Sequence, residues 1–110
     1  MYDLAEQTER FILIGVALSD NDDTKESLEE LKELTETAGA CAVGIVIQNR
    51  EKIHPSTYIG KGKIEEVRKL INETDATGII CDDELSPAQL RNLEDALQTK
   101  VLDRTMLILD

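Results

Sequence analysis

The sequence predicts an α/β domain in which a four-stranded, mainly parallel sheet lies between two layers of helices. Three observations lead to this prediction. Short apolar runs rich in β-branched residues alternate along the chain with segments whose leucines recur at helical spacing. Regular alternation of this kind is typical of right-handed strand–helix–strand units and a parallel sheet. The length of 110 residues suits one domain.

The first half of the chain contains two apolar runs separated by one helical pattern. Residues 11–18 are apolar almost throughout, as expected for a strand that is covered on both faces. Asp23 and Glu26 have the spacing of a helix-capping box, and Gly39 is a suitable C-terminal stop. The second strand is expected at residues 41–48. The helix between the strands buries a stripe formed by Leu28, Leu31, Leu34 and Ala38.

A long connection over residues 49–60 precedes the second helix. It has no clear periodicity and contains Pro55. Connections of this length are usually functional or mobile. In the helix that follows, Arg68 and Lys69 are expected to point away from the buried stripe. That stripe consists of Ile64, Val67, Leu70 and Ile71.

The last part of the chain repeats the strand–helix–strand pattern. A third strand is expected at residues 78–82 and a short fourth strand at residues 101–103. Ser86 is followed by a proline at the first helical position and by Gln89 three residues later, so the third helix begins there. Its buried face consists of Leu90, Leu93 and Leu97.

The expected strand order is 2-1-3-4, with the chain reversing direction across the sheet between strands one and three. Ligands of such folds bind at this switch point, beyond the carboxyl ends of the strands. Carboxylates there either hold Mg²⁺ through oxygen ligands or cap helices and stay solvated. We favour the second interpretation, because Asp23 already has a capping role. For a magnesium site the candidates are Asp20, Asp82 and Asp83, and the wider acidic group also includes Asp22 and Glu84.

The charge of the chain is strongly negative but unevenly distributed. A net charge of −11 argues against non-specific binding to nucleic acid or to anionic membranes. Residues 1–49 carry 3 basic and 11 acidic side chains, residues 70–110 carry 3 and 9, and residues 50–69 carry 6 and 3. Half of all lysines and arginines therefore lie in residues 50–69, which we call the basic segment.

The run Gly60-Lys61-Gly62-Lys63 lies where the basic segment turns into the second helix. Glycine allows a ligand to approach the backbone closely, and a helix start offers unpaired N–H groups to an anion. The spacing does not match a Walker A loop, which excludes an NTPase phosphate loop of that type in this chain. Two interpretations remain open, a helix start with solvated lysines and a contact with an anion or an RNA backbone. The basic connection before it favours contact.

The few aromatic and histidine side chains give weak functional signals. Tyr58, one of three aromatic residues, either stacks on an RNA base or packs under the connection, and packing is the stronger expectation. His54 is the sole histidine, so it cannot anchor a usual zinc site, and we expect a surface residue.

The cysteines and the hydropathy indicate a protein of the cytoplasm. Cys41 and Cys81 lie in apolar runs and are expected to be reduced, buried core thiols. No apolar run approaches the roughly 20 residues that span a bilayer, and the N-terminus lacks the pattern of a signal peptide.

Three ordered motifs give the chain a specific resemblance. Residues 54–67 (HPSTYIGKGKIEEV), 83–94 (DELSPAQLRNLE) and 101–110 (VLDRTMLILD) resemble the N-terminal region of the HflX family of ribosome-associated GTPases. Residues 8–16 (TERFILIGV) also fit the start of that region, so the resemblance covers essentially the whole chain.

The resemblance implies a domain that belongs to a larger GTP-binding protein. Residues 1–104 would form the N-terminal α/β domain, and residues 105–110 would begin a following helical segment. A separate G domain beyond Asp110 would hold GTP and Mg²⁺, so the resemblance implies no GTP hydrolysis by this fragment. The family is associated with the large ribosomal subunit and its rRNA, and with the rescue of stalled ribosomes during stress.

The resemblance also implies roles for particular residues. Arg91 and Arg104 are candidates for contacts with the following helical segment. The RNA- or nucleotide-binding candidates are Tyr58, Gly60, Lys61, Gly62 and Lys63, to which the basic segment adds Arg68.

Two other functions remain as alternatives to an RNA-binding regulatory domain. One is an adenine-nucleotide site with its own Mg²⁺-dependent hydrolysis, which would use the acidic switch point and residues 60–63. The other is an intramolecular docking domain that restrains the G domain. The apolar residues 105–109 would also allow the fragment to self-associate.

Overall fold

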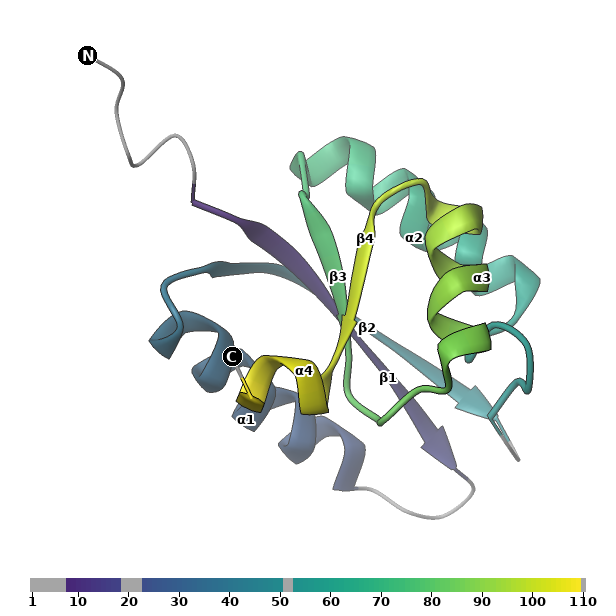
Figure 1. The fold of residues 1–110 in the computed structure, drawn as a ribbon, viewed down its shortest axis with the longest axis horizontal. Coiled ribbons are helices and arrows are strands. Elements are labelled where there is room, and N and C mark those ends of the chain that lie inside the picture. Colours follow the sequence, from purple (N-terminus) through teal and green to yellow (C-terminus); the bar gives the residue numbers. More distant parts are fainter. Residues whose placement is uncertain (1–7, 19–22, 51–52, 110) are drawn as a thin grey trace.

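The structure is a computed structural model that describes residues 8–18, 23–50 and 53–109. Within these ranges four strands and four helices alternate (Figure 1). The elements are β1 (Arg10–Leu18), α1 (Asp23–Thr37), β2 (Cys41–Arg50), α2 (Lys61–Thr74), β3 (Gly78–Cys81), α3 (Pro87–Leu97), β4 (Lys100–Asp103) and α4 (Arg104–Leu109). The sheet order is β2-β1-β3-β4 and every neighbouring pair is parallel, which confirms the predicted fold.

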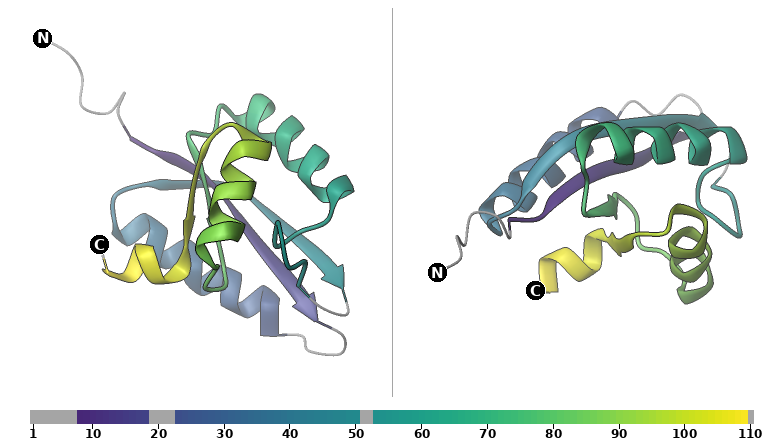
Figure 2. Two further views of the ribbon diagram at one scale, coloured as in Figure 1. Left: turned by 45° about the vertical axis from the view of Figure 1, so that its right-hand side comes forward. Right: turned by 90° about the horizontal axis from the view of Figure 1, so that it is seen from above.

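The central strand β1 supplies side chains to two cores, one on each face of the sheet. Ile12 and Ile14 belong to a core with residues of α2 and α3, whereas Phe11 and Leu13 belong to a core with residues of α1. Figure 2 shows the same division, with α2 and α3 on one face and α1 and α4 on the other. Because both faces are covered, alternation in β1 gives a continuous apolar run.

Two of the predicted helix ends are confirmed, the start of α3 and the end of α1, whereas the capping role expected for Asp23 stays a prediction. The Ser86 hydroxyl accepts a hydrogen bond from the Gln89 N–H at 3.1 Å, and the Ser86 N–H donates to the Gln89 side chain at 3.0 Å, which confirms the predicted capping box. Gly39 follows α1 with a φ of 92°, a value that glycine adopts without strain. The chain also becomes helical again at Arg104. Whether α4 begins a longer helical segment stays a prediction.

Both cysteines were expected to be buried, and this is correct for one of them and wrong for the other. Cys81 is buried in the centre of the sheet, but Cys41 is exposed. The reason is the position of β2 at the edge of the sheet, where one side of the strand has no neighbour among the described strands. The same edge leaves Ile45 40% exposed. An apolar run therefore predicted the strand correctly but not its burial.

Candidate functional site

The predicted switch point is present and forms a small pocket. β1 lies between β2 and β3, so the connections after β1 and β3 leave the sheet in opposite directions. A pocket of about 180 Å³ opens where these strands end. It is lined by Val16, Leu18, Asp23, Thr24, Ser27, Asp82 and Asp83.

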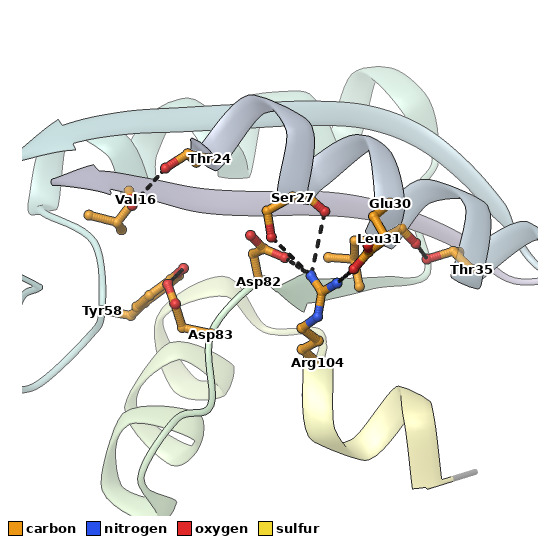
Figure 3. A network of polar contacts seen from close by, with 10 residues as sticks. All are labelled: Val16, Thr24, Ser27, Glu30, Leu31, Thr35, Tyr58, Asp82, Asp83 and Arg104. Atoms are coloured by element: carbon orange, nitrogen blue, oxygen red, sulfur yellow. Dashed lines mark hydrogen bonds and ion pairs between the residues drawn. The ribbon is translucent and has the colours of Figure 1, made fainter. Parts of the chain in front are cut away.

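Asp82 is engaged by side chains of the domain itself. Its side chain is 7% exposed and forms an ion pair with the guanidinium of Arg104 (Figure 3). Burial raises the pKa of the Asp82 carboxyl, while the hydrogen bond with Ser27 and the charge of Arg104 oppose this rise. Asp82 is therefore a carboxylate that already has a cation beside it.

Arg104 joins three elements of this domain. Its guanidinium donates a hydrogen bond of 3.1 Å to the Ser27 hydroxyl and forms ion pairs with Asp82 and with Glu30 (Figure 3). These contacts hold the start of α4 against α1 and the end of β3. The expected role of Arg104 in holding the following helical segment stays a prediction, and within the described residues its guanidinium contacts α1 and Asp82.

Of the three magnesium candidates, the structure describes Asp82 and Asp83, and both have partners within the domain. Asp20 and Asp22 lie outside the described residues. Asp83 accepts a hydrogen bond from Tyr58, and Asp82 is paired with Arg104. Within the described part of the chain, no group of three or more His, Cys, Asp or Glu side chains is placed to hold a metal ion.

Tyr58 is a core residue and does not present its ring to a ligand. Its side chain is 0% exposed, and its hydroxyl donates a hydrogen bond of 2.6 Å to Oδ2 of Asp83. Burial first, and then this bond, raise the pKa of the phenol. The φ of Tyr58 is 70°, a conformation that L residues adopt rarely. The packing interpretation therefore describes Tyr58, and stacking on a base does not fit this conformation.

The connection before α2 is a turn fixed by hydrogen bonds. His54 and Tyr58 form a two-residue bridge, in which the Tyr58 N–H donates to the His54 carbonyl at 2.9 Å. Side chains of α3 hold the turn from the other side, because Gln89 donates to the His54 carbonyl and Asn92 to the Ser56 carbonyl, both at 3.0 Å. His54 Nδ1 accepts the Ser56 N–H at 3.2 Å. His54, which was expected at the surface, is half-buried, and its ring and carbonyl accept hydrogen bonds that hold the turn.

The α2 start presents its first turn to solvent. Gly60 precedes α2 with extended backbone angles and no side-chain cap. Its own N–H donates to the Gln48 side chain at 2.8 Å, so Gly60 is buried and used in packing. Lys61 and Gly62 are exposed, and a Cβ placed on Gly62 would meet no atom within 4 Å. A ligand can therefore approach this turn closely.

The basic side chains of α2 differ in their partners. Lys63 pairs with Glu66 at 3.2 Å. Arg68 pairs with Glu65 at 3.0 Å and donates to the Ala96 carbonyl of α3 at 2.7 and 3.0 Å. The side chain of Lys61 has no hydrogen-bond or ion-pair partner among the described residues. The exposed side chain of Arg91 on α3 likewise has none within the ranges that the structure describes.

A second pocket, of about 460 Å³, opens between α2, α3 and the turn. It brings together Lys61 and Arg68, two of the predicted binding candidates, with residues that the sequence did not single out for binding. Its lining is His54, Thr57, Lys61, Ile64, Glu65, Arg68 and Ala96. Lys61 and Arg68 are seven residues apart on α2, which places them on one face of the helix. The sequence pattern does not reveal that α3 contributes Ala96, because this depends on how the two helices pack. We call this pocket the α2–α3 pocket.

No helix among the described residues is long and apolar enough to cross a membrane.

Comparison with known proteins identifies the family. A family model described as GTP-binding GTPase N-terminal matches residues 25–110. The GTPase HflX of Lacrimispora saccharolytica is 66% identical over 110 residues, which cover 100% of this chain and 26% of that protein. The GTPase HflX of Caldanaerobacter subterraneus subsp. tengcongensis is 47% identical over 110 residues, or 100% of this chain and 25% of that protein.

A solved structure supports the fold independently. A GTP-binding protein from the archaeon Sulfolobus solfataricus, in complex with GDP, matches 91% of this chain and 29% of its own length with a TM-score of 0.67 and 23% identity. At this identity the likeness concerns the fold alone. The chain spans about a quarter of the length of the curated relatives described above. The family match and the full-length identity place the chain in the HflX family, as its N-terminal domain.

Proposed function

We propose that this domain is the ribosome-binding and regulatory module of a cytoplasmic GTPase of the HflX type, and that it contacts rRNA of the large subunit through the α2 start. The single observation that carries the proposal is the state of Lys61, an exposed lysine without a partner among the described residues, beside an uncapped helix start. Phosphate is the anion that such a site favours.

The other lysine of the run is compatible with the same contact. The ion pair of Lys63 with Glu66 joins two residues of one exposed helix turn, with side chains 23% and 57% exposed. Pairs of this kind contribute little to stability, so exchange of Glu66 for an RNA phosphate costs little. Binding to rRNA would then depend on a local basic surface in a chain with a net charge of −11.

We assign nucleotide chemistry to the rest of the parent protein. GTP and Mg²⁺ would bind the G domain, and residues 1–110 would contribute affinity for the ribosome and regulation during translation and stress, without hydrolysis of their own. The switch-point pocket fits a nucleotide phosphate poorly, since Asp23 and Asp83 line it beside the Asp82–Arg104 ion pair and would repel the phosphate.

Charge reversal in the full-length parent protein tests the proposal. The double variant Lys61→Glu/Lys63→Glu should weaken binding to purified large ribosomal subunits at least tenfold at moderate salt. The matched control is Lys25→Glu/Lys32→Glu, which makes the same charge change on α1, across the sheet from α2. An equal loss of affinity in the two double variants would indicate a general effect of charge. Unchanged affinity in Lys61→Glu/Lys63→Glu would contradict the proposal.

A further inference from the structure

The α2–α3 pocket has the size and walls of a receptor for a flat ring. Its volume of about 460 Å³ lies within the range of roughly 300–1,000 Å³ that is typical of small-molecule sites. Ile64 and Ala96 give it an apolar lining, one residue from each helix. The apolar faces of a planar group of moderate size would therefore be removed from water on entering it, which is favourable.

Arg68 supplies a fixed planar cation to the wall of this pocket. Two of its nitrogens donate to the Ala96 carbonyl, at 2.7 and 3.0 Å, and a third atom of the guanidinium pairs with Glu65 at 3.0 Å. Three contacts restrain the orientation of the guanidinium plane. Arginine planes of this kind stack on nucleobases. Because these contacts already order the side chain, stacking would cost it little further conformational entropy.

Polar groups at the pocket offer both kinds of hydrogen bond. His54 Nδ1 accepts N–H bonds from the turn, so the neutral ring carries its proton on Nε2 and can donate there. Glu65 has carboxylate oxygens that accept hydrogen bonds. The edge of a nucleobase likewise presents donors and acceptors side by side.

Charge complementarity decides the class of occupant. The formally charged side chains of the pocket are those of Lys61, Arg68 and Glu65, which gives a formal net charge of +1 in a strongly acidic chain. Each nucleotide of RNA carries one negative charge and one flat ring. An acidic peptide without aromatic side chains would satisfy Lys61 but would leave the Arg68 plane without a ring to stack on.

We propose that the α2–α3 pocket holds one unpaired nucleotide of RNA, with its base against Arg68 and its phosphate at Lys61. This inference rests on the proposed ribosome-binding function and specifies the feature of the RNA that is read. It predicts that the domain recognises a splayed base in a loop or bulge, and not the backbone of a duplex.

The test compares normal and abasic RNA, because the two carry the same phosphates. Full-length parent protein is titrated with a mixed-sequence single-stranded RNA decamer and with a decamer of the same length made of abasic ribose phosphates. Three variants accompany the wild type. Ala96→Phe fills the pocket, Ala96→Met fills it with a more adaptable side chain, and Ala88→Phe places the same ring at an exposed position of α3 outside it.

The wild type and Ala88→Phe should bind the normal decamer roughly 5- to 150-fold more tightly than the abasic one, the usual range for one stacked base. Both Ala96 variants should lose this preference while they retain the affinity of the wild type for abasic RNA. Equal discrimination in all four proteins would overturn the pocket assignment. Complete displacement of the decamer by millimolar AMP or UMP would also overturn it, since the site would then belong to free nucleotides.

The outcomes also separate this inference from the proposed function. If Lys61→Glu/Lys63→Glu weakens ribosome binding but the Ala96 variants discriminate normally, the pocket inference alone fails. If the wild type binds neither large subunits nor RNA, both fail.

Discussion

The hydroxyl of Tyr58 donates a hydrogen bond of 2.6 Å to Oδ2 of Asp83 and thereby ties the turn before α2 to the end of β3. The bond lies between the two pockets of the domain, of which Asp83 lines one and neighbours of Tyr58 line the other. Asp83 lines the switch-point pocket, and Tyr58 is four residues from His54, with which it closes the turn beside the α2–α3 pocket. Together with the Gly60–Gln48 bond, this hydrogen bond connects the α2 start, with Lys61, to the sheet.

Removal of the phenol hydroxyl should loosen this link without emptying the core. In Tyr58→Phe the ring still fills its site, while the hydrogen bond to a charged acceptor is lost, which costs about 1.5–3 kcal/mol. Urea unfolding of the 110-residue chain measures the difference, with an unchanged m-value as the sign that the fold is intact. Tyr58→Ala also creates a cavity and should cost about 3–5 kcal/mol. Equal stability of wild type and Tyr58→Phe would show that the bond contributes nothing.

The ion pair of Asp82 and Arg104 should make stability depend on pH. Because burial raises the pKa of Asp82, the folded protein holds that proton more tightly than the unfolded chain does. Ionisation of this carboxyl therefore lowers the free energy of unfolding at pH values above its raised pKa. The loss disappears as the pH falls below about 3.9, the pKa of an aspartate in the unfolded chain. Loss of Arg104 enlarges this cost.

The variant Arg104→Met should accordingly lose about 2–3 kcal/mol at pH 7 and much less at pH 4, because the side chain of Asp82 is 7% exposed and its charge would lack compensation. Urea unfolding at a series of pH values checks this. Glu30→Gln is the control, since Glu30 is 66% exposed and its pair with Arg104 should contribute under about 1 kcal/mol. A pH-independent loss in Arg104→Met would contradict the explanation.

Local signals in the sequence were sufficient to predict the helices and strands and their order along the chain. The capping box of Ser86 and the apolar run of β1 involve neighbours in the chain, so the pattern contains the necessary information. The Tyr58–Asp83 and Arg104–Asp82 contacts join residues 25 and 22 positions apart. They depend on the register of β3 and on helix packing, which a pattern of residue types does not specify. The exposure of Cys41 was missed for a related reason, because an apolar run does not reveal which strand lies at the edge.

Two glycines should respond in opposite ways to alanine. In Gly15→Ala the new Cβ would lie 2.9 Å from Cδ1 of Leu28, so this buried side chain must repack or α1 must move, at a cost of about 1–3 kcal/mol. In Gly62→Ala the Cβ enters open space on a helix, which should stabilise the domain by about 0.4–1 kcal/mol. Midpoints of denaturant unfolding measure both. Stabilisation by Gly15→Ala would show that α1 packs less closely than described.

The two thiols should react at different rates. Cys41 is exposed at the edge of the sheet, whereas Cys81 is fully buried and burial raises its pKa. Titration of the native chain with a thiol-specific chromogenic reagent should release one fast equivalent. The second should appear only after a denaturant is added. Two fast equivalents would indicate that the sheet opens around β3.

The salt dependence of ribosome binding tests the central claim most directly. Each lysine that contacts a phosphate contributes roughly 0.7–0.9 to the slope of log affinity against log salt concentration, because its counterions are released. Large-subunit binding by the full-length parent protein should therefore show a slope that is smaller in magnitude by about 1–2 in Lys61→Gln/Lys63→Gln than in the wild type. An identical slope and affinity in the two proteins would contradict the account.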